Sequence, residues 1–591
     1  MNLTQAIKIR WIGFSALLIA FLTLWLCQTS ISGWCNDESA HIPAGLYHLE
    51  TGRMDAYRVN PPLPRMLAAL PLVVDRPKVE WHYSESPYVR SEYHFANEWV
   101  PDNLEALPRY LFLGRSTVLV FFTIGLWAIS RWAWRLYGKV AAWTAATLWS
   151  MNPDIITNSA VVAPDLPAAA SGLLAGYVYW DWLGRRERPF PWTVAAAVAF
   201  AILCKFSWLF LVPLLPCVTM VYDLVSDHKR PASAAADDPS QSVSPRKFDR
   251  VRDSLRLLLS FSLTVLLINW CYGFDGTGTQ LGDFQFISQS FAGQNVPSGS
   301  TGNRFANGVL AVVPVPLPAE MIRGIDYLKW EFETGMQCYL RGEWKHRGWW
   351  YFHLYAIAVK MPLGYLFLIG GGFLSLVWDR CRNKPLEKIE WLPIMLAAIF
   401  IALVSSQTGF THHVRYVLPA YGFLFIVASR CVSRLPQRWA IVLVFVCLSG
   451  TMWFHATHLG LSHTFFNPLA GGPNNGWRHL SFSNVDWGQS TYRMVDWVKE
   501  HPEQRPMTVQ FVSSLGNPAQ LVADEEEVFT STGWRQANGE SVATPSRSGW
   551  YLISSYQTTF SRNRYFWDKQ PIAQPYPDVL LFHVSPEDSG D

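Results

Sequence analysis

Charged side chains are scarce in this chain. Asp, Glu, Lys and Arg make up 16% of the 591 residues, against about 25% in an ordinary globular protein. Hydrophobic residues make up 50% and gather into long runs separated by short basic clusters. This composition excludes a simple soluble domain and indicates a polytopic α-helical membrane protein. The net charge of +3 is too small to suggest nucleic acid as a partner.

The common nucleotide-binding and hydrolase motifs are also missing. We find no Walker loop, no dinucleotide-binding glycine fingerprint and no G-x-S-x-G elbow, so energy must come from the substrate itself or from an ion gradient. The nine cysteines lack metal-type spacing. A disulfide between two of Cys35, Cys271 and Cys338 stays open, although buried or free thiols are the commoner outcome.

About eleven apolar runs approach the ~20 residues that cross a bilayer. They lie near 11–33, 108–130, 138–153, 166–184, 191–204, 207–225, 254–272, 351–377, 390–407, 414–430 and 439–456. The basic clusters fall on one side if the N-terminus is cytoplasmic and 191–225 is a hairpin. Lys8 and Arg10 precede the first run without a cleavage site, which indicates an uncleaved anchor in the cytoplasmic membrane.

This orientation divides the chain into a membrane domain, 1–456, and an extracytoplasmic region, 457–591. The membrane domain has outer loops at 34–107 and 273–350 and a cytoplasmic loop at 226–252, and we expect an interfacial helix at 63–74. Apolar runs at 507–513, 549–555 and 578–583 are typical of strands, and 490–500 of a helix. They predict a small α/β domain outside the membrane.

Two adjacent carboxylates, Asp37 and Glu38, follow the first span directly. Charge near hydrocarbon is disfavoured by a few kcal/mol or more, so a function is expected. Asp37 is the candidate general base for an acceptor hydroxyl, and the alternative is an ordinary helix cap. His41, one turn further on, can share a helical face with Asp37 and is a candidate for positioning the acceptor or a metal, the alternative being an ordinary interfacial histidine. Asp165 opens another span on the same side and is a candidate for positioning the acceptor or a metal, or for stabilising its helix N-terminus.

Four basic residues lie at or near the outer ends of apolar runs: Arg115, Lys205, Lys360 and Arg415. Snorkelling toward the headgroups is the ordinary fate of such side chains. Four of them beside an acidic pair instead suggest an anion entering from the lipid, because a phosphate needs charge-assisted donors. We therefore predict that they bind the donor phosphate.

Several motifs, taken together and in order over residues 34–490, resemble a known family. The motifs are Asp37-Glu38-Ser39-Ala40-His41, Asn60-Pro61-Pro62-Leu63, Asn152-Pro153 with Pro164-Asp165, Lys205-Phe206-Ser207, Gly348-Trp349-Trp350-Tyr351-Phe352, Lys360-Met361-Pro362-Leu363, Arg415-Tyr416-Val417-Leu418-Pro419 and Ser483-Asn484-Val485-Asp486-Trp487-Gly488-Gln489. With these motifs the chain resembles bacterial members of the protein O-mannosyltransferase group, which are glycosyltransferase family 39-like enzymes of the GT-C fold, akin to the aminoarabinose transferase of lipid A.

The resemblance implies an inverting transferase that uses a polyprenyl-phosphate sugar. Asp37 would be the catalytic base with Glu38 and Asp165 beside it, and basic residues would receive the phosphate. The acceptor hydroxyl would belong to a protein, a lipid or a glycan. No cofactor is required by the pattern, and a divalent metal at the carboxylates stays open.

Two other classes remain as alternatives. A secondary transporter or lipid flippase would use the carboxylates for proton coupling, but such proteins tend to show inverted repeats and mid-span charges. A non-catalytic membrane scaffold would bind a partner through its outer domain. Replacing Asp37 by Asn distinguishes both from a transferase.

Overall fold

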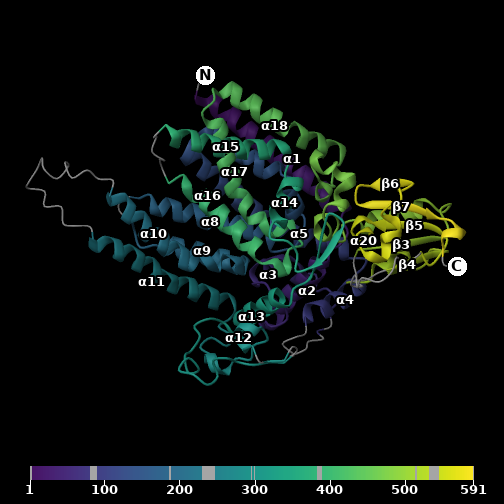
Figure 1. Cartoon of the computed structure of the whole chain (residues 1–591), viewed down its shortest axis with the longest axis horizontal. Coiled ribbons are helices and arrows are strands. Elements are labelled where there is room, and N and C mark those ends of the chain that lie inside the picture. Colours follow the sequence, from purple (N-terminus) through teal and green to yellow (C-terminus); the bar gives the residue numbers. More distant parts are fainter. Residues whose placement is uncertain are drawn as a thin grey trace, which may run out of the picture.

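The structure is a computed structural model that describes residues 3–79, 81, 90–185, 188–228, 247–294, 296–297, 300–382, 389–512, 515–531 and 545–589. Helices form its larger part, and a β-sheet close to the C-terminus lies at one end (Figure 1). The predicted cytoplasmic loop 226–252 lies mostly outside the described residues. All nine cysteines are free, so the structure forms no disulfide among Cys35, Cys271 and Cys338.

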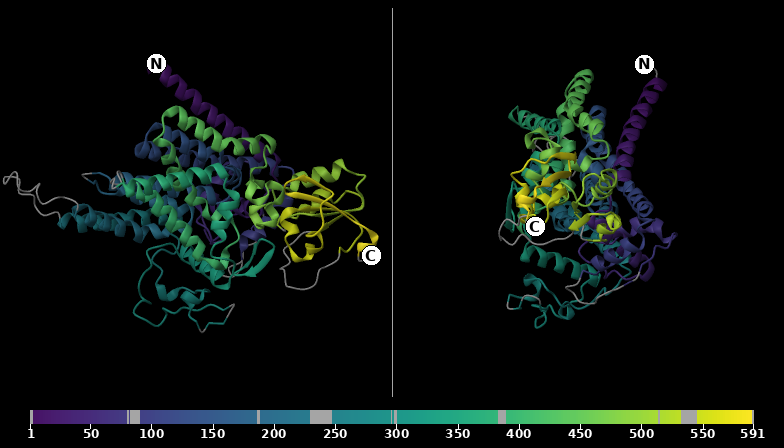
Figure 2. Two further views of the ribbon diagram at one scale, coloured as in Figure 1. Left: turned by 45° about the horizontal axis from the view of Figure 1, so that its top comes forward. Right: turned by 90° about the vertical axis from the view of Figure 1, so that its right-hand side faces the viewer.

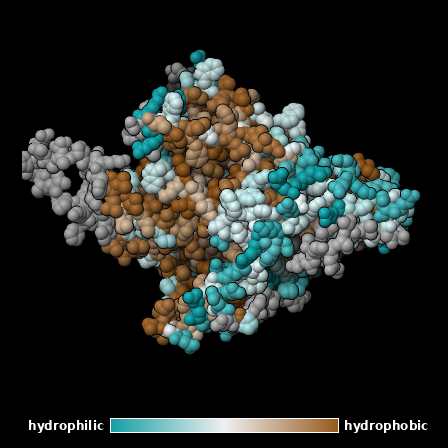
Figure 3. Space-filling view, viewed as in Figure 1, coloured by the Kyte–Doolittle hydropathy of each residue, from teal (hydrophilic) through white to brown (hydrophobic). Residues whose placement is uncertain are grey.

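Six described helices are long and apolar enough to cross a membrane, or seven if one bent pair counts as a span. Hydrophobic side chains cover the surface over these helices, whereas hydrophilic ones cover the end that holds the sheet (Figure 3). The chain is therefore a polytopic helical membrane protein. The six segments are Gly13–Ile31, Leu107–Tyr137, Phe206–Val225, Arg252–Cys271, Val414–Ser433 and Gln437–Thr457.

The count of eleven spans stays a prediction. Several predicted runs do form helices, but α6, α9 and α16 have 13, 13 and 16 residues, which is short for a crossing of about 20 residues. The helices of this part are α1 Leu3–Ile31, α5 Leu107–Tyr137, α6 Lys139–Met151, α7 Pro153–Ser159, α8 Asp165–Leu183, α9 Trp192–Cys204, α10 Leu211–His228, α11 Lys247–Cys271, α14 Phe352–Lys360, α15 Leu363–Cys381, α16 Trp391–Ser406, α17 Leu418–Ser433 and α18 Gln437–Thr457.

Helix α17 is the centre of the helical part. Nearly all of its residues are buried, and it packs against α5, α6, α8, α15 and α16. Small residues allow the close approach: a Cβ on Gly372 of α15 would lie 2.1 Å from the carbonyl oxygen of Val427. A helix that is apolar all round is typical of such a buried position.

The predicted span 351–377 is wrong as a single helix. The segment instead forms α14 and α15, which meet at an angle of 116°. The break falls at Met361 and Pro362, where the residue before proline takes an extended conformation. Proline lacks the backbone N–H and disfavours the helical conformation of the residue before it. The helix is therefore interrupted at Pro362, although the sequence stays hydrophobic on both sides of it.

The two loops predicted to lie on the outer side contain their own short elements. The first holds α2 Asn36–Thr51, α3 Leu63–Ala69, η1 Leu70–Val73 and α4 Ser91–Asp102, and the second holds α12 Gln289–Ala292, α13 Ala319–Thr334, β1 Gln337–Leu340 and β2 Glu343–His346. The helix expected at 63–74 is thus present as α3 with η1. An ion pair of 2.5 Å between Arg58 and Glu320 joins the two loops.

The chain after 457 forms α19 Thr491–Glu500, α20 Ser555–Thr558 and a five-stranded sheet in the order β4-β3-β5-β7-β6. Strand β3 runs parallel to β4 and β5, and β7 pairs antiparallel with β5 and β6. The strands are β3 Met507–Gln510, β4 Val528–Ser531, β5 Gly549–Ser554, β6 Ala573–Tyr576 and β7 Val579–Val584. The predicted runs 507–513, 549–555 and 578–583 contain β3, β5 and most of β7, and 490–500 contains α19.

The two faces of this sheet have different partners. Leu552 and Leu581 pack with Met494 and Val498 of α19, whereas Ile553 and neighbouring side chains of the opposite face belong to the core shared with the membrane helices. Successive strand residues point to opposite faces, which explains the division. The sheet is therefore packed directly on the helical part, as two further views show (Figure 2).

Candidate functional site

The acidic pair lies in the first turn of α2, a few residues after α1 ends. Carboxylates are stabilised there because the helix dipole presents its positive end. Residues i and i+1 of a helix do not share a face, so Asp37 and Glu38 point in different directions. Asp37 is partly exposed, whereas Glu38 is fully buried.

Asp37 forms an ion pair with a residue 378 positions away. Its Oδ2 accepts a hydrogen bond from Nη1 of Arg415, and its Oδ1 accepts one of 3.3 Å from Nε1 of Trp487. Arg415 lies in the short 3-10 turn before α17. Burial raises the pKa of Asp37, but the Arg415 guanidinium outweighs it, so that the pKa falls below the usual value. The carboxylate is thus ionised at neutral pH.

Asp165 and Lys205 complete a four-residue cluster with Asp37 and Arg415. Oδ2 of Asp165 lies 3.6 Å from Nη1 of Arg415, and Nζ of Lys205 lies 2.5 Å from Oδ1 of Asp165. Asp165 opens α8 and Lys205 follows α9 directly, so two helix ends meet here. The cluster has two carboxylates and two cations, and we call it the outer charge cluster after the side of the membrane predicted for Asp37 and Asp165.

Arg415 retains an unused donor. Its Nε is buried and has no hydrogen-bond partner among the residues that the structure describes. A buried N–H without an acceptor costs about 1–3 kcal/mol. A hydrogen-bond acceptor that reached this side of the guanidinium would satisfy the group.

Glu38 and Arg115 lie behind the outer charge cluster and bind each other. Nε and Nη2 of Arg115 donate to the two carboxylate oxygens of Glu38 at 2.8 and 2.7 Å. The same carboxylate accepts from the backbone N–H groups of Cys35 and Val162, each at 3.0 Å. Arg115 also donates to three carbonyl groups between residues 29 and 33. Both side chains are essentially inaccessible to solvent, so neither can contact a substrate in this structure.

Lys360 and His41 also have other partners. Nζ of Lys360 donates to the carbonyl oxygens of His463 and Asn484 at 2.8 and 2.9 Å and lies 3.9 Å from Asp154. His41 stacks on Tyr57, and its Nδ1 accepts from Nε of Arg65 at 3.4 Å. Burial, followed by the charge of Arg65, lowers the pKa of His41 to about 3. The imidazole is therefore neutral at physiological pH.

A small cavity adjoins Arg415 and Trp487. Its volume is about 30 Å³, and its lining includes Asp154, Asn158 and Lys360. About 10–15 Å³ suffices for one water molecule when measured with a probe of that size. The cavity thus has room for water and not for a sugar, so a large substrate must approach Asp37 from its exposed side.

Trp487 is a contact of Asp37 that the sequence interpretation did not single out. It lies in the segment 483–489, whose motif supports the family resemblance but indicates no role for the tryptophan. Asn484 holds the neighbouring chain in place, because its side chain accepts from Val414 N and donates to His412 O, both at 2.7 Å. The only available signal was the motif itself, since nothing in its spacing links it to Asp37.

Comparisons with known proteins give no family. No family model and no curated protein matches the chain. Among solved structures, it is similar to ArnT from Cupriavidus metallidurans bound to undecaprenyl phosphate, with 11% identity, 98% of this chain and 99% of that chain covered, and a TM-score of 0.43. The same protein in the apo state gives 11% identity, 99% of each chain and a TM-score of 0.45.

A third similar structure is the oligosaccharyltransferase AglB from Archaeoglobus fulgidus in complex with an inhibitory peptide and a dolichol-phosphate. Identity is 10%, the coverage is 94% of this chain and 72% of that chain, and the TM-score is 0.45. At TM-scores under 0.5 these likenesses assign neither a fold nor an activity.

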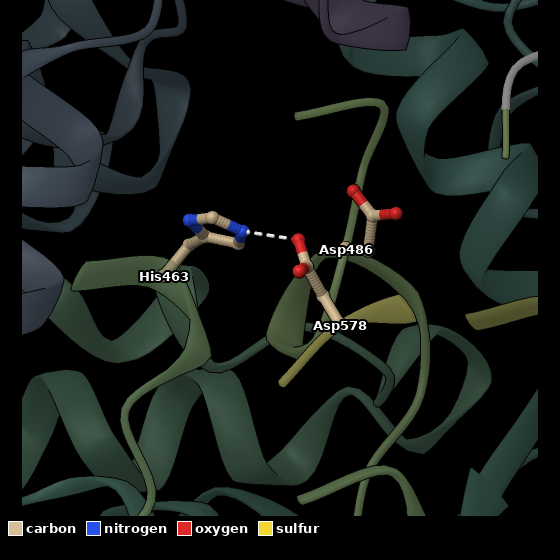
Figure 4. A group of neighbouring side chains, drawn as sticks. All are labelled: His463, Asp486 and Asp578. Carbon is tan, nitrogen blue, oxygen red and sulfur yellow. Dashed lines mark hydrogen bonds and ion pairs between the residues drawn. The ribbon is translucent and has the colours of Figure 1, made fainter. Parts of the chain in front are cut away.

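One group of metal-ligating side chains lies away from the outer charge cluster: His463, Asp486 and Asp578 (Figure 4). The amide of Gln28 fixes the histidine tautomer. Its Oε1 accepts from the backbone N–H of Ser462 at 2.8 Å, so its Nε2 must donate to Nδ1 of His463 at 3.0 Å. Nε2 of His463 therefore carries the proton and donates to Asp578 at 2.8 Å.

The carboxylates of the same group already have other partners. Arg493 pairs with Asp578, and Asp486 accepts from the hydroxyl groups of Ser490 and Ser554 and from two backbone N–H groups. A metal ion needs free lone pairs on deprotonated ligands. Here Nε2 of His463 carries a proton, and Asp578 is paired with the Arg493 guanidinium. The residues therefore do not fit a resident metal and form a structural junction instead.

Proposed function

We propose that this protein is an inverting GT-C-type membrane glycosyltransferase. It transfers a sugar from a polyprenyl-phosphate donor to a hydroxyl group of a protein, lipid or glycan acceptor on the outer side of the cytoplasmic membrane. The observation that supports this most is the meeting of Asp37 and Arg415 at the outer charge cluster. A base and a cation for a leaving phosphate are the two groups that such a reaction needs.

Asp37 takes the proton from the acceptor hydroxyl. The acceptor oxygen forms the new bond to the anomeric carbon, the bond from this carbon to the phosphate oxygen breaks, and polyprenyl phosphate leaves with the electron pair. The lowered pKa of Asp37 keeps the base ionised at neutral pH, while its exposed side gives the acceptor access. Positioning supplies much of the remaining barrier reduction.

Arg415 changes partner in this proposal. In the structure it is paired with Asp37 and Asp165. A donor phosphate entering beside it competes for the guanidinium and accepts a hydrogen bond from Nε. The ion pair between Arg415 and Asp37 is thereby weakened, which makes the Asp37 carboxylate a stronger base. Lys205, paired with Asp165 at the same place, supplies a second positive charge for the leaving group.

Glu38 and Arg115 act as positioning residues and do not touch the substrate. Their ion pair holds the first turn of α2 against the end of α1 and the segment at Val162. Lys360 fixes the segments around His463 and Asn484, from which Trp487 reaches Asp37. We propose an N-terminus in the cytoplasm and the sheet on the outer side, because the basic clusters beside the spans favour this orientation and Trp487, which precedes the sheet in the chain, contacts Asp37.

Replacing Asp37 by Asn tests the proposal against the transporter and scaffold alternatives. Lipid extracts from cells with the wild-type protein, the D37N variant and no protein are searched by mass spectrometry for a polyprenyl-linked sugar. We expect this lipid to accumulate in the last two. In proteoliposomes supplied with the extracted lipid and a membrane fraction as acceptor, release of polyprenyl phosphate should fall about 10²–10⁴-fold in D37N, with lipid binding retained.

Asp283→Asn is the matched control, because Asp283 is an exposed carboxylate of the second outer loop. It should behave as the wild type. Turnover that survives in D37N would overturn the assignment of the base. Movement of the intact lipid-linked sugar across the bilayer, without release of polyprenyl phosphate, would instead establish a flippase.

A further inference from the structure

The second outer loop contains a long stretch without charge. Residues 305–319 include no Asp, Glu, Lys, Arg or His, and within it Val309, Leu310, Val312 and Val313 are exposed, Val309 to 91%. We call residues 309–313 the apolar tip. A contiguous exposed patch of large aliphatic side chains on a soluble surface marks an interaction site.

Hydrogen bonds tie the apolar tip to the outer end of a membrane span. The backbone N–H groups of Leu281 and Gly282 donate to Val313 O at 3.0 Å and Ala311 O at 2.9 Å. The side chain of Asn269, in the last turn of α11, donates to Pro316 O at 2.9 Å. The tip is therefore held next to α11 and has a fixed place relative to it.

The end of α11 marks the level of the membrane surface. Trp270 is its penultimate residue and is 73% exposed, and an exposed Trp at a span end is typical of the lipid headgroup region. Further along the same helix Leu255, Leu259 and Leu266 are exposed, as expected of a lipid-facing side. Phe274, three residues after the helix ends, extends this apolar surface toward the loop.

The loop turns back beside this helix end. Figures 1 and 2 show the segment between α11 and α13 folded alongside the outer end of α11, and not directed away with the sheet. In the space-filling view a hydrophobic patch lies at this corner of the molecule, next to the hydrophobic surface of the helices (Figure 3). The apolar tip and the lipid-facing side of α11 thus form one continuous surface.

We infer that the apolar tip inserts into the outer leaflet of the bilayer and anchors the second outer loop to it. The partner is the upper acyl-chain region of the lipid, because the exposed side chains are aliphatic and uncharged and the surface continues that of a membrane span. Unpaired backbone groups are unfavourable in lipid, and the hydrogen bonds to residues 278–282 satisfy several carbonyl and amide groups of the segment. This inference does not depend on the proposed reaction.

The anchor also connects to the outer charge cluster. Helix α13 follows the uncharged stretch at once, and its Glu320 pairs with Arg58 of the first loop. Tyr57, the neighbour of Arg58, stacks on His41 of α2. Insertion of the tip therefore fixes one end of a chain of contacts that reaches the helix carrying Asp37.

The test measures the depth of the tip directly. Leu310 is replaced by trifluoromethylphenylalanine in the full-length protein, which is reconstituted into nanodiscs of zwitterionic lipid, and its ¹⁹F signal is recorded. Phe445 of α18, an exposed side chain within a span, serves as the lipid-facing reference. Ile572, exposed near the C-terminal sheet, serves as the water-facing reference.

When the lipids carry a nitroxide on an upper acyl carbon, we expect the ¹⁹F line of the label at position 310 to broaden, as the line at position 445 does. A water-soluble paramagnetic chelate should leave the width of the line at position 310 unchanged. A signal that behaves as at Ile572 would overturn the inference. Protection from both reagents would also overturn it, since the tip would then be covered by protein.

Discussion

Asp37 and Glu38 are neighbours in the sequence, yet the structure gives them opposite surroundings. Glu38 is enclosed by Arg115 and by backbone N–H groups, whereas Asp37 faces the exposed side and shares Arg415 with Asp165. The sequence identified both as candidates for catalysis, because both sit at the mouth of a span. It did not show which one meets solvent, since that depends on the rotation of α2 against α5.

The different surroundings predict different effects of amide substitution on stability. Glu38→Gln leaves Arg115 as an uncompensated buried charge, which should lower the free energy of unfolding by about 3–5 kcal/mol. Asp37→Asn leaves Arg415 with its second partner Asp165 and should lower the free energy of unfolding by less. Thermal unfolding of the two variants in the same detergent checks this order. Equal shifts in Tm would contradict the assignment of Glu38 to a structural pair.

Arg415 offers a second prediction at this scale. Arg415→Lys keeps the positive charge but shortens the side chain and removes Nε and the planar fork. Loss of one donor to developing negative charge costs about 10²–10³ in kcat, so we expect a fall of this size in release of polyprenyl phosphate. Arg478→Lys, at an exposed position, is the matched control. An unchanged kcat in the Arg415 variant would remove this residue from the leaving-group site.

At the scale of elements, helix α2 and its surroundings bury several histidines. His48 lies in the last turn of α2, where its Nδ1 pairs with Arg53 O at 2.7 Å and its Nε2 with Nη1 of Arg65 at 3.1 Å. Burial, followed by the charge of Arg65, lowers the pKa of His48 to about 3. The folded protein therefore holds this imidazole neutral, while the unfolded chain protonates it near the ordinary value of 6.5.

This difference makes stability depend on pH. Below the unfolded pKa the unfolded state binds more protons, so stability falls as the pH drops from about 6.5 toward 3. At pH 5 a single such histidine contributes a loss of about 2 kcal/mol. His48→Gln should remove this share of the slope of Tm against pH between 7.5 and 5. His583→Gln, at an exposed position, should leave the slope as it is, and a slope unaltered by His48→Gln would refute the neutral buried state.

The elements that could be predicted from sequence are those with strong local patterns. Helix α19 and strands β3, β5 and β7 follow from apolar runs of the right length, and α3 with η1 follows from the amphipathic segment after the prolines. The bend between α14 and α15 was missed because hydropathy does not register direction, although Pro362 was a visible signal. The contact between Asp37 and Trp487 could not be predicted, because nothing local links residues 450 positions apart.

At the scale of the whole molecule, the sheet and the helices share one core. Ile553 and Phe582 of the sheet belong to the same buried cluster as the membrane helices. A polar junction strengthens this attachment: Gln28 of α1 contacts His463, which donates to Asp578 at the start of β7, and Asp578 pairs with Arg493 of α19. Three distant parts of the chain thus converge on one carboxylate.

Asp578→Asn tests whether this junction attaches the sheet. The substitution leaves Arg493 buried without its counter-charge, so we expect a loss of about 3–5 kcal/mol in the stability of this region. Hydrogen exchange followed by mass spectrometry should show faster exchange in β5 and β7, with α5 and α17 unchanged. Asp524→Asn, at an exposed carboxylate of the same region, is the control. Because Trp487 reaches Asp37 from the segment next to Asp486, loosening here should also reduce turnover. If exchange in β5 and β7 stayed at the wild-type rate, hydrophobic packing alone would hold the sheet on the helices.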